Sequence, residues 1–192
     1  TVNLCALDLS RAFDRTSHYA VYIRLMEMKL PVEILNILES WFSMSETCVL
    51  WCGHVSPFFR LRTGVRQGGV LSHLLFAILI DSLVTKIKST NVGCYLNTTC
   101  VSIFLYADDI VLLAPSVSAL EQLLHVCENE LADLDMRINS RKSFCMRFGP
   151  RFDITCANIT SLNDEVLQWV TCCRYLGVYF VSGRVFKCSF HN

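Results

Sequence analysis

Two strongly apolar runs on either side of Ala107-Asp108-Asp109 constrain the fold of this chain more than any other feature. In the segment VSIFLYADDIVLLAP, hydrophobic residues precede and follow the two acids. Apolar runs of this length are typical of strands buried on both faces, and the short separation predicts a tight hairpin. We therefore expect a hairpin whose tip carries Asp108 and Asp109 between Tyr106 and Ile110.

Two adjacent carboxylates at the tip of an apolar hairpin are costly, because their charges repel and burial adds a penalty unless a cation is present. Acidic residues are also common in exposed turns, so the pair alone is a weak functional signal. Asp8 strengthens it, since VNLCALDL (residues 2–9) has the pattern of a buried strand that ends in an acid. Asp14 is a fourth candidate, although near the start of a helix it is better explained as a cap or an ion-pair partner.

Asp8, Asp108 and Asp109 are accordingly predicted to form one acidic site that binds divalent metal ions. Mg²⁺ takes carboxylate oxygens, water and substrate phosphate as ligands. Two such ions roughly 3.5–4 Å apart can stabilise both the attacking and the leaving oxygens of an in-line displacement. We expect phosphoryl-transfer chemistry with two Mg²⁺ (or Mn²⁺) ions as cofactors.

The remaining sequence predicts an α+β fold. With 53% hydrophobic and 18% charged residues, the 192-residue chain has the composition of a packed domain. Helices are expected at about Ser17–Lys29, Pro31–Ser43, Leu71–Lys88 and Ser118–Asp135. Further strands are expected at residues 48–51, 58–62, 143–148 and 174–180. This order favours an antiparallel sheet with helices packed on one face.

Charge gives only a local signal for a nucleic-acid partner. The formal net charge is zero, so no global basic field is present. A local basic stretch is either a solvated surface or a patch that faces phosphates. Its members are Arg137, Arg141, Lys142, Arg147 and Arg151.

Cysteine usage and hydropathy indicate the environment. Eleven irregularly spaced cysteines support neither a disulfide framework nor a zinc site, and we expect small buried thiols in a reducing, intracellular setting, cytoplasm and/or nucleus. No signal peptide opens the chain, and the most apolar stretch, Val70–Val84, is too short and too interrupted to span a bilayer. No membrane association is expected.

Five sequence blocks resemble, in order, the motifs of reverse transcriptases, most closely those of non-LTR (LINE-type) retrotransposons. LDLSRAFDRTSH (residues 7–18) is similar to the first palm motif and GVRQGGVLSHLLFAILID (64–81) to the second. Tyr106-Ala107-Asp108-Asp109 resembles the Y/F-x-D-D signature. INSRKS (138–143) is similar to the lysine-bearing segment and RYLGVYF (174–180) to the block near the primer grip.

The resemblance implies a polymerase palm with fingers and thumb largely absent. Residues 1–180 would be the palm, and residues 181–192 a truncated start of the thumb or an unstructured end. One departure is His73, which stands where the family usually has a proline. A proline is readily replaced at the start of a helix, although its loss is also compatible with a decaying copy of an element.

The resemblance also implies roles around the acids. Asp8 and Asp108 would be the principal metal ligands, helped by the backbone carbonyl of Leu9, and Asp109 would complete the triad. Lys142 would protonate the pyrophosphate leaving group.

Further residues would contact nucleotide and primer. Phe13 stands where the family keeps an aromatic gate against a ribose 2′-OH, with core packing as the alternative. Arg66 would meet a phosphate or cap the preceding strand, and Gln67 and Gly68 would line the incoming nucleotide and the template. The primer grip would comprise Tyr175, Leu176 and Gly177.

The expected function is that of an RNA-directed DNA polymerase. It would transfer a nucleotide from a dNTP to a primer 3′-OH, with an RNA template and a DNA primer as partners. Two alternatives remain open: a catalytically inert relic of a retroelement, and a nucleic-acid-binding fragment without chemistry. A nucleotide cyclase on a related palm fold fits less well, because the RQGG and RYLG blocks do not suit it.

Overall fold

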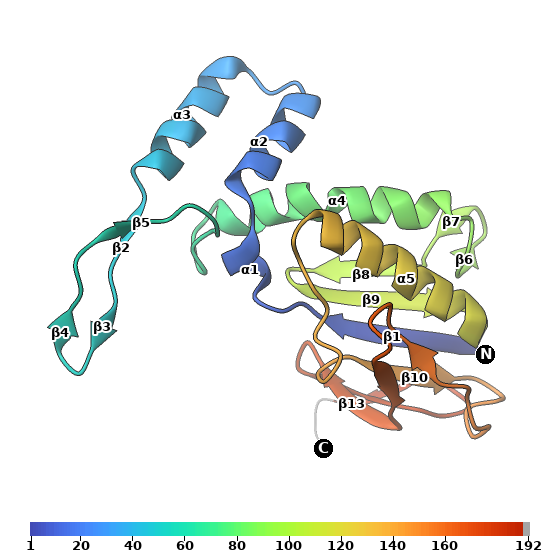
Figure 1. Cartoon of the computed structure of the whole chain (residues 1–192). Helices are drawn as coiled ribbons and strands as arrows, with labels where there is room; N and C mark the ends of the chain where they lie inside the picture. Colours follow the sequence, from blue (N-terminus) through green and yellow to red (C-terminus); the bar gives the residue numbers. More distant parts are fainter. Residues whose placement is uncertain (190–192) are drawn as a thin grey trace. The chain divides into compact units, whose positions relative to one another are not determined.

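The computed structural model describes residues 1–189 and divides the chain into two compact units. The first unit combines Thr1–Ser10 with the chain from Ser82 onward, and the second is Arg11–Asp81. The expectation that residues 1–180 form one palm domain stays a prediction. Figure 1 shows the elements of both.

A six-stranded sheet in the order β11-β12-β10-β1-β9-β8 forms the centre of the first unit. The central strand β1 pairs antiparallel with β9 on one side and with β10 on the other. The strands are β1 (Val2–Asp8), β8 (Ile103–Tyr106), β9 (Asp109–Ala114), β10 (Phe144–Phe148), β11 (Ile159–Thr160) and β12 (Val166–Trp169). This confirms the α+β class and the buried first strand.

One strand pair departs from the predicted antiparallel sheet, because β12 runs parallel to β10. After β10 the chain first forms β11, which pairs antiparallel with β12. This additional reversal brings β12 back in the direction of β10.

The two faces of the sheet are covered differently. A three-stranded sheet, β13-β14-β15 (Cys172–Tyr175, Val178–Val181 and Lys187–Ser189), packs through Tyr175 and Phe180 on the face that carries Leu4, Ala6 and Val111. Helix α5 (Val117–Asp133) contacts β1 and β9. Its buried side chains, at helical spacing, are Leu120, Leu123, Leu124, Cys127 and Leu131.

Helix α4 (Ser72–Ser89) runs through the boundary between the units. Its C-terminal part carries the buried residues Leu83 and Ile87, and the Lys86 ammonium lies 3.5 Å from the Glu130 carboxylate of α5. A small hairpin, β6 (Tyr95–Leu96) and β7 (Thr99–Cys100), follows. No helix within residues 1–189 is long and apolar enough to cross a membrane.

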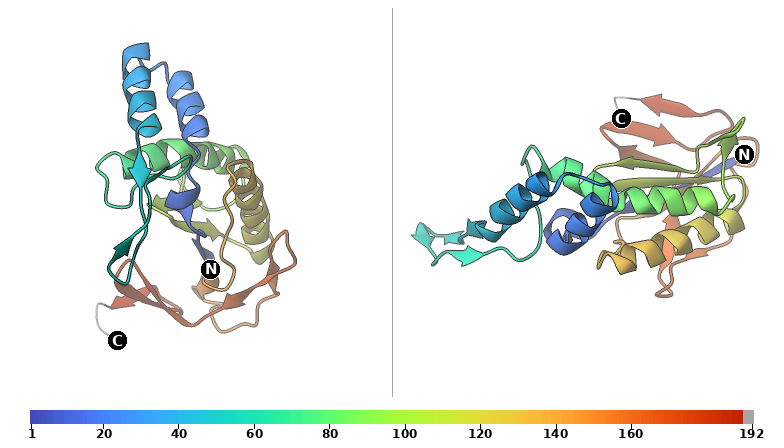
Figure 2. Two further views of the ribbon diagram at one scale, coloured as in Figure 1. Left: turned by 60° about the vertical axis from the view of Figure 1, so that its left-hand side comes forward. Right: turned by 90° about the horizontal axis from the view of Figure 1, so that it is seen from above.

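The second unit holds three whole helices, the first part of α4 and a narrow β-hairpin. Ser17 caps α2 as expected, with its Oγ accepting a hydrogen bond from the Ala20 N–H at 3.3 Å, and Pro31 precedes α3. Figure 2 shows α3 leading into the hairpin. The helices are α1 (Ala12–Arg15), α2 (His18–Glu27) and α3 (Val32–Ser43). The strands are β2 (Glu46–Thr47), β3 (Leu50–Trp51), β4 (His54–Val55) and β5 (Phe59–Arg60).

Two expectations are corrected. Strand β8 is not buried on both faces: it lies at the sheet edge, where Phe104 and Tyr106 are exposed. Cysteines are free as expected, but Cys52, Cys172 and Cys188 are exposed rather than buried. Within residues 181–189 β15 pairs with β14, and residues 190–192 lie outside the described part of the chain, so the start of a thumb or an unstructured end at residues 181–192 stays a prediction.

Candidate active site

The tip of the β8–β9 hairpin is a two-residue turn, Ala107-Asp108, closed by the pair Tyr106 and Asp109. Ala107 adopts a left-handed backbone with φ of 52°. For a residue with a Cβ, this conformation costs about 1–2 kcal/mol. The predicted hairpin is confirmed, and its tip holds a strained residue next to the acids.

The sheet register places Asp8 directly opposite Asp109 across β1 and β9. Residues that face each other in an antiparallel pair have Cβ atoms about 4.5–5.5 Å apart and point to the same face. The two carboxylates therefore lie side by side, with Asp108 adjacent in the turn. All three residues are partly buried.

The electrostatics of the pair favour a bound cation. Burial, followed by repulsion from Asp108 and Asp8, raises the pKa of Asp109 above its usual value. Across residues 1–189, no three His, Cys, Asp or Glu side chains converge closely enough to hold a metal ion. Mg²⁺ prefers carboxylate oxygens, so the Asp8–Asp109 pair fits this ion chemically. Asp108 as a third ligand stays a prediction.

Lys142 lies beside Asp8. Its Nζ is 3.8 Å from Oδ2 of Asp8, and the exposed lysine makes this a weak ion pair. The segment around it is fixed on Asp8: the Asn139 N–H donates to the Asp8 carbonyl at 2.8 Å, and the Asp8 N–H donates to Ser143 Oγ at 3.1 Å. Leu9 is buried and forms an isolated bridge with Ile138.

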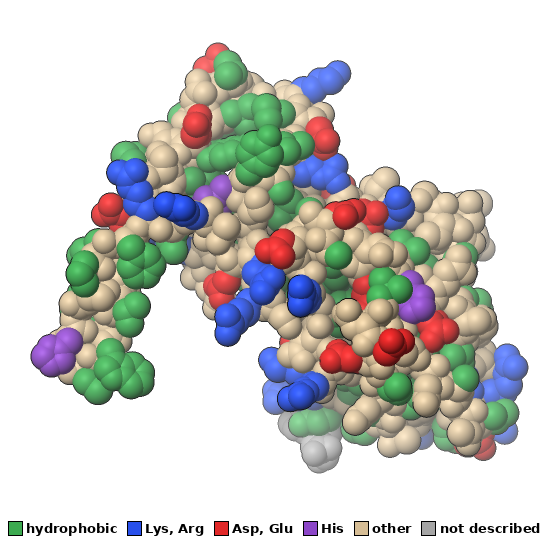
Figure 3. Space-filling view, in the orientation of Figure 1, with side chains coloured by type: hydrophobic (Ala, Val, Ile, Leu, Met, Phe, Trp, Pro, Cys, Tyr) green, Lys and Arg blue, Asp and Glu red, His purple; other side chains and the backbone are tan. Residues whose placement is uncertain are grey.

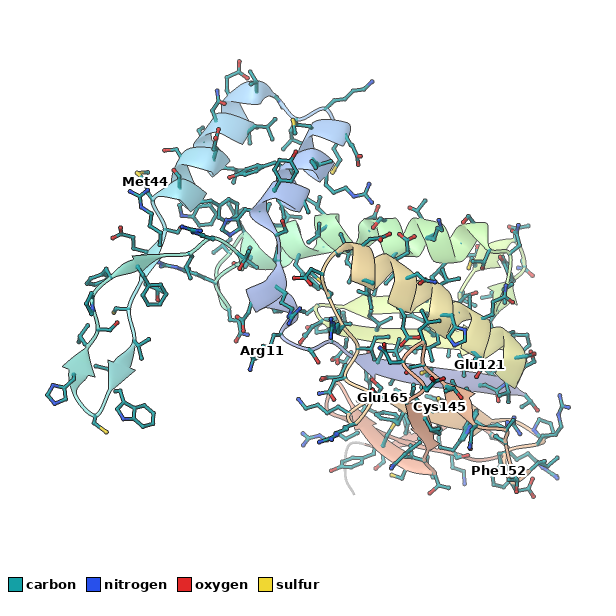
Figure 4. All side chains as sticks on the ribbon, viewed as in Figure 1. Arg11, Met44, Glu121, Cys145, Phe152 and Glu165 are labelled. Atoms are coloured by element: carbon teal, nitrogen blue, oxygen red, sulfur yellow. The ribbon has the colours of Figure 1, made fainter. Side chains whose placement is uncertain are left out.

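Asn139, Ser143 and Glu165 are positioning residues that sequence reasoning missed. Ser140 donates a hydrogen bond to the carboxylate of Glu165, which holds the lysine-bearing segment at a further point. Glu165 is labelled in Figure 4. Asn139 and Ser143 belong to the INSRKS block, so the block itself was the available signal. Glu165 gave none, because its partner is 25 residues away.

The predicted primer-grip residues lie on the same face of the sheet as the acids. Leu176 and Gly177 both have positive φ, 48° and 80°, as a two-residue type I′ hairpin turn requires. Tyr175 packs on the core formed by Leu4, Ala6 and Val111. Burial and then the Asp109 carboxylate raise the pKa of Tyr175 to about 12. The structure therefore brings Tyr175 close to Asp109.

The predicted nucleotide-contacting residues, apart from Leu9, belong to the second unit. The Gly64 and Val65 N–H groups donate to the carbonyls of Thr16 at 2.8 Å and Phe13 at 2.9 Å, which joins the RQGG segment to the first motif. Gly64 has φ of 89°, and a Cβ there would lie 2.9 Å from the Asp14 carbonyl oxygen. Only glycine fits this position.

Phe13 and Arg66 have partners within their own unit. The Phe13 ring is buried against Phe76 at 5.0 Å and His73 at 5.2 Å, so core packing describes its surroundings and the gate stays a prediction. Arg66 donates to the Glu46 carbonyl at 3.2 Å. Gln67 and Gly68 are exposed.

An apolar cavity of about 320 Å³ lies next to the RQGG turn. His18 stacks on Phe42 there with ring centroids 4.0 Å apart, and its Nε2 lies 2.6 Å from the Gly64 carbonyl oxygen. The wall residues include Trp41, Leu61, Arg66, Gly69 and Leu71.

The five basic residues of the stretch do not form one surface patch, because the Arg147 side chain is bound to other residues of the fold. Its Nε donates to Asn3 Oδ1 at 2.8 Å, Nη1 donates to the Ile154 carbonyl at 3.3 Å, and its guanidinium lies 5.5 Å from the centre of the Trp169 ring. Arg137, Arg141 and Arg151 are exposed.

Comparison with known proteins identifies relatives over most of the chain. A family model described as "Reverse transcriptase (RNA-dependent DNA polymerase)" matches residues 3–180. The Pol polyprotein of the retrotransposable element R2 from Nasonia vitripennis is 28% identical over 93% of this chain, and that of R2DM from Drosophila melanogaster is 27% identical over 95%. The polymerase of the mobile element jockey from Drosophila melanogaster is 26% identical over 90%. The chain spans only 18% of each R2 protein and 19% of the jockey protein.

Solved telomerases share the fold. Apo telomerase from Candida tropicalis, truncated from its C-terminal domain, superposes with a TM-score of 0.65 at 14% identity and covers 98% of this chain and 35% of its own. Telomerase from Candida albicans in complex with a fragment of telomeric RNA gives 0.64 at 14% identity and covers 98% and 30%. At this identity the likeness concerns the fold alone.

Proposed function

Because the chain belongs to the reverse transcriptase family, we propose that it supplies the catalytic core of an RNA-directed DNA polymerase of the non-LTR retrotransposon type. The observation that carries the proposal is the register of Asp8 against Asp109, with Lys142 at Asp8 and Tyr175 near Asp109. The RNA template, the DNA primer and the dNTP are the substrates that this function requires.

Asp8, Asp109 and Asp108 would hold two Mg²⁺ (or Mn²⁺) ions. When bound, the ions would activate the primer 3′-OH and stabilise the charge that develops on the α-phosphate. The raised pKa of Asp109 supports this assignment, since a cation between the carboxylates relieves their repulsion.

The remaining side chains would bind and orient the substrates. Lys142 is exposed, so its ammonium can carry a proton on Nζ toward the pyrophosphate leaving group. The turn after Tyr175 would position the primer end over Asp109. Phe13, Arg66, Gln67 and Gly68 keep the nucleotide-facing roles that the family resemblance implies.

Primer extension tests the proposal. The chain, and any longer polypeptide in which it is expressed, is incubated with an RNA template, a DNA primer, dNTPs and Mg²⁺. We expect incorporation that Asp108→Asn and Asp8→Asn reduce by several orders of magnitude, whereas the matched variant Asp133→Asn on α5 leaves it unchanged. Incorporation that Asp108→Asn leaves unchanged would contradict the proposal.

Metal binding supplies an independent readout. Titration of the chain with Mn²⁺, followed by electron paramagnetic resonance, is expected to reveal binding that Asp8→Asn and Asp109→Asn each weaken. Binding that survives both substitutions would place the ions elsewhere.

A further inference from the structure

The β-hairpin of the second unit, residues 46–60, exposes an unusual amount of apolar surface. A two-stranded hairpin is marginally stable in water at best, and an exposed apolar patch of this kind marks an interaction surface. Figure 3 shows hydrophobic side chains along this arm. The exposed residues are Val49 (54%), Leu50 (69%), Trp51 (76%), Val55 (60%), Phe58 (68%) and Phe59 (48%).

The aromatic side chains of the hairpin have a defined arrangement. Cys52 and Gly53 form a two-residue turn with positive φ at both positions, 47° and 78°, which fixes the register of the strands. Trp51 stands directly opposite His54, so the two rings lie on one face at the tip. Leu50 and Val55 occupy the other face. The tip therefore presents an aromatic platform, Trp51 and His54, to solvent.

The net charge of the hairpin and the residues that follow it is positive. Residues 46–63 include Arg60 and Arg62, at the base of the hairpin, and one acid, Glu46. Arg60 lies 3.9 Å from Glu46 in an exposed contact that binds it weakly. The hairpin thus combines exposed rings at its tip with net positive charge at its base, and a nucleic acid, which carries both flat bases and phosphates, complements both features.

We propose that this hairpin binds single-stranded RNA. Bases would stack on the platform formed by Trp51 and His54, and Arg60 and Arg62 would neutralise backbone phosphates. Base stacking on aromatic side chains tolerates any sequence, because every base has a π-face. The choice of RNA rests on the proposed function, in which the unpaired strand ahead of synthesis is the RNA template.

Binding of a fluorescent 12-nucleotide RNA to the whole 192-residue chain, without metal or dNTP, tests the platform. We expect Trp51→Ala to weaken binding roughly 5- to 100-fold and Trp51→Phe to restore most of the affinity. Tyr19→Ala is the matched control, because Tyr19 is 74% exposed in the same unit but lies on α2. Circular dichroism verifies the fold of each variant. Equal affinity of Trp51→Ala and the unsubstituted chain would overturn the proposal.

The salt dependence of RNA affinity tests the role of Arg60 and Arg62. Each phosphate contact on a single strand contributes about 0.7 to the slope of log K against log salt, so Arg60→Gln/Arg62→Gln should lower the slope by about 1.4. Arg151→Gln/Arg184→Gln removes the same charge from the first unit and should leave the slope unchanged. An unaltered slope in the hairpin variant would count against nucleic acid as the occupant.

Two further outcomes would identify another occupant. Tighter binding of single-stranded DNA of the same sequence would overturn the assignment to RNA. A concentration-dependent dimer that Trp51→Ala dissociates, with RNA affinity unchanged, would assign the hairpin to a second copy of the chain. The binding assay contains no metal and no dNTP. A failure of the RNA-binding proposal therefore leaves the primer-extension result of Asp108→Asn unaffected, and a failure in primer extension leaves the RNA-binding result unaffected.

Discussion

Ala107 sits at the most strained position of the acidic hairpin, with φ of 52° at a turn that glycine would adopt without cost. We expect Ala107→Gly to stabilise the chain by about 0.5–1 kcal/mol, and Ala107→Val to destabilise it by about 1–2 kcal/mol, because a β-branched side chain fits this conformation worst. Urea unfolding gives both values. Equal stability of the two variants would show that the turn is not strained.

Because of Asp109, the stability of the folded chain should fall as pH rises, whereas most carboxylates in folded proteins have the opposite effect. The folded pKa of Asp109 is raised, so the ionised form is penalised, and stability is lost as pH rises from the unfolded value, about 3.9, through the folded pKa. Asp109→Asn should therefore raise the melting temperature at pH 7 in EDTA and have a smaller effect at pH 3. Mg²⁺ should stabilise the unsubstituted chain more than the variant. An equal rise in melting temperature at pH 7 and pH 3 would show that ionisation of Asp109 is not what destabilises the chain.

At the scale of elements, α5 fastens the edge of the main sheet. Glu121 accepts a hydrogen bond from the Thr160 N–H at 2.9 Å, and Glu128 accepts one from the Leu162 N–H at 2.9 Å. His125 lies 2.7 Å from the Thr160 carbonyl oxygen. The amphipathic pattern of Ser118–Asp135 predicts the helix but not these contacts, because their partners lie 34 to 39 residues away.

Removal of one of these hydrogen bonds should loosen the chain near β11 and β12. Glu121→Ala leaves the Thr160 N–H without its acceptor and is expected to cost about 1 kcal/mol. Amide exchange at residues 158–168 should become faster, while Asp133→Ala on the exposed side of the same helix changes nothing. Unchanged exchange at Thr160 would contradict the anchoring role of α5.

The turn that precedes α4 offers a matched pair of glycines. Both have positive φ, but a Cβ at Gly64 would lie 2.9 Å from the Asp14 carbonyl oxygen, whereas one at Gly68 would meet open space. Gly64→Ala should therefore destabilise the chain more than Gly68→Ala, which costs only the backbone strain of about 1–2 kcal/mol. Thermal unfolding compares the two variants. Equal losses of stability would show that the cost comes from backbone strain alone and not from the contact with Asp14.

Across the whole molecule, the cysteines should react in an order set by burial. Burial raises the pKa of Cys5 and of Cys127, which suppresses their thiolates, whereas Cys52 and Cys172 are exposed. A short pulse of iodoacetamide at pH 8, read by mass spectrometry, should label Cys52 and Cys172 well before the buried pair. Simultaneous labelling would mean that the core opens readily.

Sequence predicted those parts of the molecule that carry a periodic or apolar signal. The first strand and the acidic hairpin were evident because a long apolar run leads to Asp8 and two such runs flank Asp108 and Asp109. Two-residue strands such as β11 have no period to detect, and the parallel β10–β12 pair depends on the reversal between them. The division into two units leaves no trace in the sequence, because one boundary falls inside α4, where composition does not change.

The position of β1 also has a consequence for biosynthesis. This strand is made before both of its neighbours, and its first partner to follow is β9, where Asp109 pairs with Asp8 across a separation of 101 positions. At about 5–20 residues per second, a ribosome needs roughly 5–20 s to cover that distance. Until β9 is made, the apolar strand that carries Asp8 has no sheet partner, and nascent chains of this protein are expected to depend on chaperones more than the finished fold does.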